Sequence, residues 1–187
     1  MWDSLRLPHN CFLLKRLQQK HTLYRCERLM DDTTIFVPRE LRADWPAVAS
    51  SWRRQYPSLF DEDDLRLARA QPRNHFAEWV AAIHFFQTMN FRSLVEKYAF
   101  DRHEAKAARL HRILDEPSRA RLANICRRHR CQPPDLLLYD DADALVAFAE
   151  VKGPNDRMRP TQSNMIAAVK RGFAVPVLTV RVRFVAG

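Results

Sequence analysis

Glycine and long apolar runs are the features that this chain most lacks. Only 3 of its 187 residues are glycine, whereas 47% are hydrophobic. This composition excludes a disordered chain and predicts a folded domain with a sizeable core. No run of 18 apolar residues occurs, so the sequence predicts no membrane-spanning helix. The first six residues lack the charged and apolar regions of a secretory signal. We therefore expect a cytoplasmic protein, or one delivered into a target-cell cytoplasm without a signal peptide.

Cysteine is also sparse, with 4 residues in the chain. That number is too small for a disulfide scaffold in a chain of this length. Cys126, His129 and Cys131 lie close together, but their spacing fits no familiar zinc knuckle and a second ligand pair is missing. We expect reduced thiols here and no zinc site.

Basic residues exceed acidic ones, 31 to 22, which gives a formal net charge of +9. This balance favours polyanionic partners, and nucleic acid first. Many of the basic residues lie in the stretch 103–131, which is otherwise rich in helix-forming residues. We expect this stretch, with one arginine from a later loop, to bind the phosphates of DNA. The candidates are Arg119, Arg121, Arg127, Arg128, Arg130 and Arg157.

Residues 1–72 are the least informative part of the sequence. Segments 11–20 and 39–56 have helical composition and are cut short by prolines. The acidic run at 61–64 is typical of a solvated helix start, where the helix dipole favours negative charge. We interpret this part of the chain as a mainly helical N-terminal extension.

A strong helix is predicted over 75–98, with Asn74 as its N-cap. Its residues are apolar on most sides, which is typical of a buried helix. Glu78 lies in the first turns, and its position fits a helix-start residue and a functional carboxylate equally well. Near the other end, Glu96 and Lys97 are interpreted as a solvated pair.

After Pro134 the pattern changes to short apolar runs. Residues 136–139 and 145–151 predict two strands that pair as a hairpin, and 161–171 predicts a helix. A last strand is predicted over 175–180, with an extension through Phe184 as the alternative. This order of strands and helices predicts an α/β fold with a mixed central sheet flanked by helices.

Two acids and a lysine lie at the open end of this hairpin, where the first strand begins and the second strand ends. Asp135 opens the first strand, while Glu150 and Lys152 end the second and point to the same face, since side chains two apart do so in a strand. Two carboxylates and an ammonium at a sheet edge can hold a divalent metal and place a water against a phosphate. The carbonyl of Val151 offers one more oxygen. The residues therefore predict a metal-dependent nuclease site that uses Mg²⁺ or Mn²⁺.

The same residues, Pro134-Asp135 and then Glu150-Val151-Lys152, fit the PD-(D/E)xK pattern of a large nuclease superfamily. The longer stretch, 134–139 with 150–157 and Gln162, closely resembles the VRR-NUC branch of that superfamily. This branch includes the nuclease module of the Fanconi-associated nuclease, small phage and bacterial enzymes, and some bacterial antagonistic effectors. Segments 75–79 and 94–98 also look like bacterial members, so the resemblance covers roughly 75–184.

The resemblance implies a restriction-endonuclease-like core in residues 73–187, behind the extension 1–72. It implies four catalytic residues, which are Asp135, Glu150, Lys152 and Gln162. It implies a metal site made by Glu78, Asp135, Glu150 and Val151. Lys152 would orient the attacking water or neutralise developing charge, and Gln162 would position the substrate or Lys152. The chain departs from the family at Gln132, where a glycine is usual.

The leading interpretation is a metal-dependent DNA endonuclease, with an antibacterial toxin or effector role favoured. Such a toxin would need a neutralising immunity protein, which we expect to be acidic because charge complementarity speeds association. A structure-specific repair or phage nuclease remains an alternative, as does a non-catalytic DNA-binding module on the same fold. We also allow for a homodimer, and we expect no membrane partner.

Overall fold

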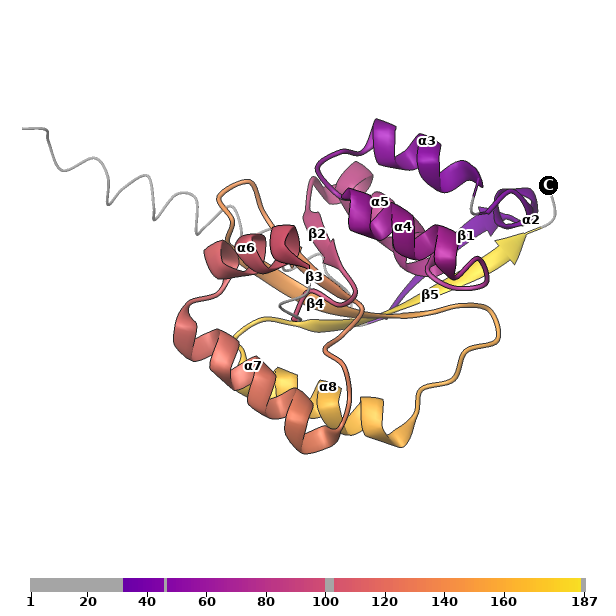
Figure 1. Cartoon of the computed structure of the whole chain (residues 1–187). Helices are drawn as coiled ribbons and strands as arrows, with labels where there is room; N and C mark the ends of the chain where they lie inside the picture. Colours follow the sequence, from indigo (N-terminus) through magenta and orange to yellow (C-terminus); the bar gives the residue numbers. More distant parts are fainter. Residues whose placement is uncertain (1–31, 46, 100–102, 186–187) are drawn as a thin grey trace, which may run out of the picture. The chain divides into compact units, whose positions relative to one another are not determined.

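The computed structural model describes residues 32–45, 47–99 and 103–185, which lie in one compact unit, 31–187 (Figure 1). Its centre is a mixed five-stranded sheet with the strand order β1-β5-β4-β3-β2. The strands are β1 (Asp32–Pro38), β2 (Arg92–Val95), β3 (Leu136–Tyr139), β4 (Leu145–Lys152) and β5 (Val177–Val185).

Helices cover both faces of this sheet. They are α2 (Arg39–Ala43), α3 (Ala47–Gln55), α4 (Glu62–Ala70), α5 (Phe76–Met89), α6 (Glu104–Ile113), α7 (Glu116–His129) and α8 (Pro160–Gly172). Figure 1 shows α3, α4 and α5 over one face, and α7 and α8 over the other. The predicted α/β fold, a mixed sheet flanked by helices, is confirmed. Within the described residues, no helix combines the length and the apolarity needed to cross a membrane.

The hairpin at the centre of the sheet forms as predicted. β3 and β4 are antiparallel, with Leu136 opposite Ala149, so Asp135 falls opposite Glu150. All four residues of β3 are buried, because helices cover both faces of the sheet here. β4 then pairs in parallel with β5, and α8 makes the crossover between them.

The helix predicted over 75–98 is shorter than expected. α5 ends at Met89, and Asn90 follows in the left-handed conformation with φ 56°, which asparagine tolerates better than most residues. The next residues turn back and form β2, which pairs antiparallel with β3. The N-cap is His75 instead of Asn74. The error arose because a short apolar run in a buried strand has the same composition as a buried helix.

The strand β1 was not predicted either, although three helices between residues 39 and 70 agree with a largely helical N-terminal part. β1 pairs in parallel with β5, with Ile35 opposite Val182. It thereby adds an edge strand to the sheet that carries the acids of the hairpin. The segment 11–20 lies outside the described residues, and the division of the chain at residue 72 stays a prediction.

The acidic run at 61–64 is only partly solvated. Asp61 caps α4 by accepting the Asp64 N–H at 2.8 Å. Asp64 itself is 4% exposed and forms an ion pair with Lys106 of α6. Burial raises the pKa of Asp64 to about 6, although the Lys106 ammonium opposes this shift. The run therefore provides both a helix cap and a buried anchor between α4 and α6.

Candidate active site

Three hydrogen bonds, each of which involves a backbone group, hold Asp135 and the residue before it at the start of β3. Its Oδ2 accepts the Val151 N–H at 2.8 Å, and its carbonyl accepts the Glu96 N–H at 2.7 Å. The Tyr98 hydroxyl donates to the Pro134 carbonyl at 2.7 Å. The carboxylate is therefore fixed at the point where β2, β3 and β4 meet.

Glu150, Lys152 and Gln162 form a closed hydrogen-bonded network at the end of β4. Glu150 Oε1 accepts from Lys152 Nζ at 2.7 Å and from Gln162 Nε2 at 2.6 Å. Lys152 Nζ also donates to Gln162 Oε1, at 3.2 Å. Glu150 is 1% exposed and Lys152 is 6% exposed. Gln162 reaches them from the first turn of α8, so all three side chains point to one place.

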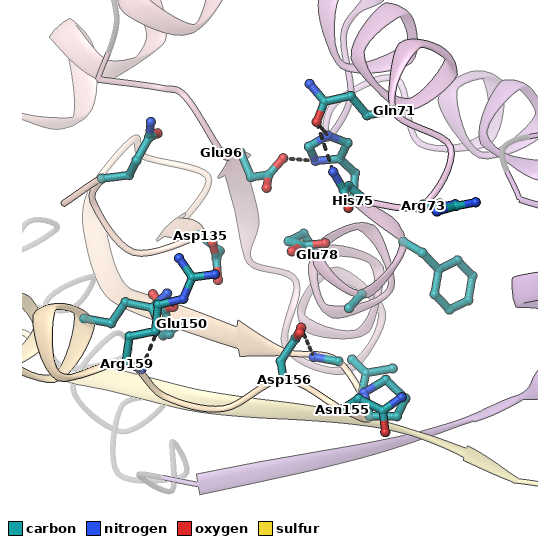
Figure 2. A pocket seen from close by; sticks show the side chains of 18 of the residues that line it. Gln71, Arg73, His75, Glu78, Glu96, Asp135, Glu150, Asn155, Asp156 and Arg159 are labelled. Atoms are coloured by element: carbon teal, nitrogen blue, oxygen red, sulfur yellow. Dashed lines mark hydrogen bonds and ion pairs between the residues drawn. The ribbon is translucent and has the colours of Figure 1, made fainter.

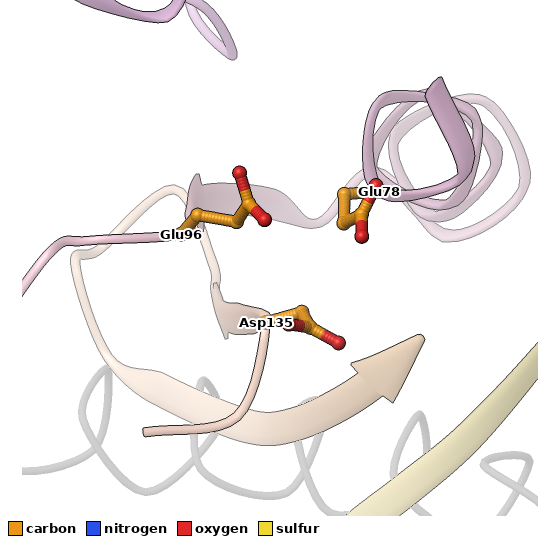
Figure 3. Close-up of side chains that lie close together, drawn as sticks. All are labelled: Glu78, Glu96 and Asp135. Atoms are coloured by element: carbon orange, nitrogen blue, oxygen red, sulfur yellow. The ribbon is translucent and has the colours of Figure 1, made fainter. Parts of the chain in front are cut away.

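A second group of acids lies beside this network (Figure 3). Glu78, Glu96 and Asp135 each present a carboxylate oxygen, and these oxygens lie within 4.8 Å of one another. They come from three elements far apart in sequence: α5, the residue after β2, and the residue before β3. Glu78 thus lies next to Asp135 although 57 positions separate them. Glu150, bound to Lys152 and Gln162, lines the same pocket but lies outside this trio.

The crowded acids hold their protons more tightly than free carboxyls do. Burial, with the nearby charge of Glu96, raises the pKa of Glu78 to about 7. Burial and the charges of Glu150 and Glu78 raise the pKa of Asp135 well above its ordinary value. Burial also raises the pKa of Glu150, against the opposing effect of Lys152. A cation placed among these acids would reverse the shifts, because it favours the ionised forms.

Glu96 was interpreted from the sequence as half of a solvated pair, and this interpretation is wrong. Its side chain is 20% exposed and contacts His75 Nδ1 through Oε2. Its backbone is left-handed, with φ 40°, which turns the chain sharply at the end of β2. Lys106 fixes this turn, since its ammonium donates to the carbonyls of Val95 and Glu96. The only signal in the sequence was a carboxylate directly after an apolar run.

These residues line a pocket of about 890 Å³ (Figure 2). Five acids face it, namely Glu78, Glu96, Asp135, Glu150 and Asp156. Six lysines and arginines also line it, namely Arg39, Arg42, Arg73, Lys97, Arg130 and Arg159. In Figure 2, Arg73 lies on one side of Glu78 and Arg159 on the other. The pocket thus has an acidic interior bordered by basic residues.

The predicted DNA-binding arginines are placed less uniformly than expected. Arg130 lines the pocket, at the end of α7. Arg119 donates instead to the Leu114 carbonyl at 2.7 Å, and Arg121 donates to the Gly172 carbonyl at 2.6 Å. The remaining three are Arg127, Arg128 and Arg157. They are exposed and do not line this pocket.

Residues 94–183 match the sequence profile of the VRR-NUC domain. This segment of the chain is therefore a VRR-NUC domain, a nuclease family of the PD-(D/E)xK superfamily. It runs from β2 into β5 and contains Asp135, Glu150, Lys152 and Gln162. Glu78 and the lining residues from 39 to 77 precede it. No curated protein gives a significant match to the chain.

Proposed function

We propose that this chain is a metal-dependent DNA endonuclease that hydrolyses phosphodiester bonds. The observation that carries the proposal is the convergence of Glu78, Glu96 and Asp135 within 4.8 Å, beside the network of Glu150 and Lys152. These three carboxylates are partly buried, and like charges in such a setting are costly unless something compensates them. A divalent cation provides that compensation.

The donor set suits Mg²⁺ or Mn²⁺, because hard cations prefer oxygen ligands. Asp135 and Glu78 would hold the ion, with Glu150 and the carbonyl of Val151 completing the predicted set and Glu96 adding a further carboxylate. When bound, such an ion lowers the pKa of its water and offsets charge on the phosphate.

The other residues of the site orient and balance charge. The Lys152 ammonium is held by Glu150 and Gln162, which fixes it beside the acids. In this position it can orient the attacking water or neutralise the charge that develops on the phosphate. Gln162 forms hydrogen bonds with both Glu150 and Lys152, so it positions these two side chains relative to each other.

Magnesium calorimetry and plasmid cleavage test the proposal together. Wild type should bind Mg²⁺ or Mn²⁺ and cleave duplex DNA, and EDTA should abolish cleavage. Asp135→Ala should lose both properties. Asp44→Ala removes an exposed carboxylate that is not among the residues lining the pocket, and it should keep both. Robust cleavage in excess chelator would contradict the metal mechanism. Metal-independent DNA binding without cleavage would favour the non-catalytic module.

The biological role follows from the substrate range, and we propose the toxin or effector role. A toxin should degrade generic duplex DNA, act in a cytoplasm, and be neutralised by an acidic partner protein. A repair enzyme should cleave only branched or flapped DNA. Expression in a bacterium with and without the neighbouring genes separates the two roles, because only a toxin needs its neighbour for the host to survive.

A further inference from the structure

The charges around the pocket are arranged in two zones. The acids of the interior repel any phosphate strand, and this repulsion is strong where water is partly excluded. The arginines at the border have the opposite effect and attract the backbone of a nucleic acid. Three of them, Arg39, Arg42 and Arg73, come from residues that precede the matched nuclease segment.

We propose that residues 39–45 and 71–74 form one wall of the DNA-binding cleft. In this arrangement, which rests on the proposed nuclease function, Arg39 and Arg73 contact phosphates on one side of the acids. Arg130 and Arg159 contact phosphates on the other side.

Hydrogen bonds within the protein hold this wall in place without a bound substrate. Arg42 donates to the carbonyls of Pro72 and Arg73, at 3.3 and 2.8 Å. Trp45 Nε1 donates to the Asn74 carbonyl at 3.0 Å. These bonds tie the 72–74 turn to α2 and to the residues after it. Arg73 is therefore presented on a fixed turn, which lowers the entropy cost of binding.

Arg39 and Arg73 are the members of this wall available to a ligand. Both are exposed, whereas Arg42 is partly buried, bonded to the turn, and lies 5.6 Å from the Phe76 ring centre. On the opposite side of the acids, Arg159 is likewise exposed and held by a hydrogen bond from its backbone. Arg159 directly precedes α8, whose first turn carries Gln162, and the Arg159 N–H donates to Gln162 Oε1 at 3.1 Å. Cations thus lie on both sides of the acids.

DNA fits these two walls better than an acidic protein does. A phosphodiester backbone has regularly spaced charges that can reach both walls, with one phosphate placed between them at the acids. The carboxylates of an acidic protein would meet the acids of the interior without that regular spacing. The walls also explain how a substrate strand can approach a site that repels it.

A pair of charge-reversal variants tests the wall. Arg39→Glu with Arg73→Glu changes the wall, and Arg127→Glu with Arg128→Glu applies the same charge change to exposed residues of α7 that do not line the pocket. Fluorescence anisotropy with a labelled duplex in Ca²⁺, at several NaCl concentrations, measures binding. We expect the wall variant to lose about 10-fold to 100-fold in affinity. The slope of log K against log salt should also fall by about 2, since each lost phosphate contact removes about 0.9.

The α7 variant should lose clearly less affinity than the wall variant, because Arg127 and Arg128 do not line the pocket. The opposite result, with affinity lost on changing α7 and kept on changing the wall, would overturn the proposal and favour the placement expected from the sequence. Mn²⁺ calorimetry and thermal unfolding check that the wall variant is folded with its metal site intact. If it unfolds, Arg39→Gln with Arg73→Gln replaces it, with an expected slope change of the same sign. A wild-type protein that binds Mn²⁺ but no DNA would refute the proposed function itself.

Discussion

Replacing Glu78 by glutamine tests whether this side chain is a metal ligand or a helix-start residue. The pKa of Glu78 rises from 4.5 to about 7 in the folded chain, first through burial and then through Glu96. A carboxyl with a raised pKa stabilises the fold fully below its unfolded value, and this contribution is lost as pH rises through the folded value. The window therefore runs from pH 4.5 to about 7. Across it, ionised Glu78 costs roughly 3 kcal/mol of folding free energy, because one pKa unit is worth about 1.4 kcal/mol.

Glu78→Gln removes this cost, so at pH 8 in EDTA the variant should be more stable than wild type by up to roughly 3 kcal/mol. In thermal unfolding this corresponds to about 6–12 °C, since each kcal/mol shifts the Tm of a domain of this size by about 2–4 °C. At pH 4 the two proteins should unfold at nearly the same temperature. Urea unfolding at both pH values gives the free energies directly.

Added Mg²⁺ or Mn²⁺ should make wild type more stable than Glu78→Gln. Wild type should gain about 4.1 kcal/mol at a metal concentration roughly 1,000 times the Kd, which exceeds the roughly 3 kcal/mol cost of ionised Glu78, whereas the variant should gain much less and lose at least tenfold in cleavage rate. Glu104→Gln is the matched control, because Glu104 is an exposed acid in the first turn of α6. It should lose only a few tenths of a kcal/mol through the helix dipole. If Glu78→Gln behaves like this control in EDTA and with metal, Glu78 is only a helix-start residue.

The remaining predictions concern the other side chains of the site. Glu150→Ala should weaken both metal binding and cleavage, whereas Lys152→Ala should keep or improve metal affinity and lose the chemical step; equal losses of metal affinity in both would contradict the assigned roles. Lys106→Met should destabilise the fold by about 3–5 kcal/mol, because it leaves Asp64 buried and unpaired. Adding Asp64→Leu should restore much of that stability in urea unfolding, yet Mn²⁺ affinity should stay low because the Glu96 turn has lost its donor. Restored metal affinity in the double variant would show that Lys106 does not position Glu96.

The hairpin part of the site could be predicted because it is local in sequence. Asp135 and Glu150 are separated by 15 positions, and the alternation of side chains in a strand fixes which residues share a face. The distance in space between Lys152 and Gln162 depends only on the short connection between β4 and α8. Short-range rules therefore placed Lys152 beside Glu150, whereas Gln162 was expected at the site from the resemblance to the nuclease family.

The basic wall could not be predicted, because its position depends on long-range pairing. β1 lies beside β5, which is 147 positions later in the chain, since Asp32 pairs with Thr179. This pairing and the packing of α5 bring Arg39 and Arg73 to the pocket. No periodicity in the sequence indicates such a contact, so only composition suggested that residues 1–72 were helical and separate.

Glu96 shows a different limit, which comes from backbone conformation. Two left-handed segments face each other across the site, with φ 70° at His75 and φ 40° and 49° at Glu96 and Lys97. Such conformations cost on the order of 1–3 kcal/mol each in non-glycine residues, so surrounding contacts must hold them. Here the His75–Glu96 contact joins the two segments, the Asp135 carbonyl accepts the Glu96 N–H, and Lys106 binds the Glu96 carbonyl. The third carboxylate is thus placed by tertiary contacts against local preference, which is why local rules assigned it to solvent.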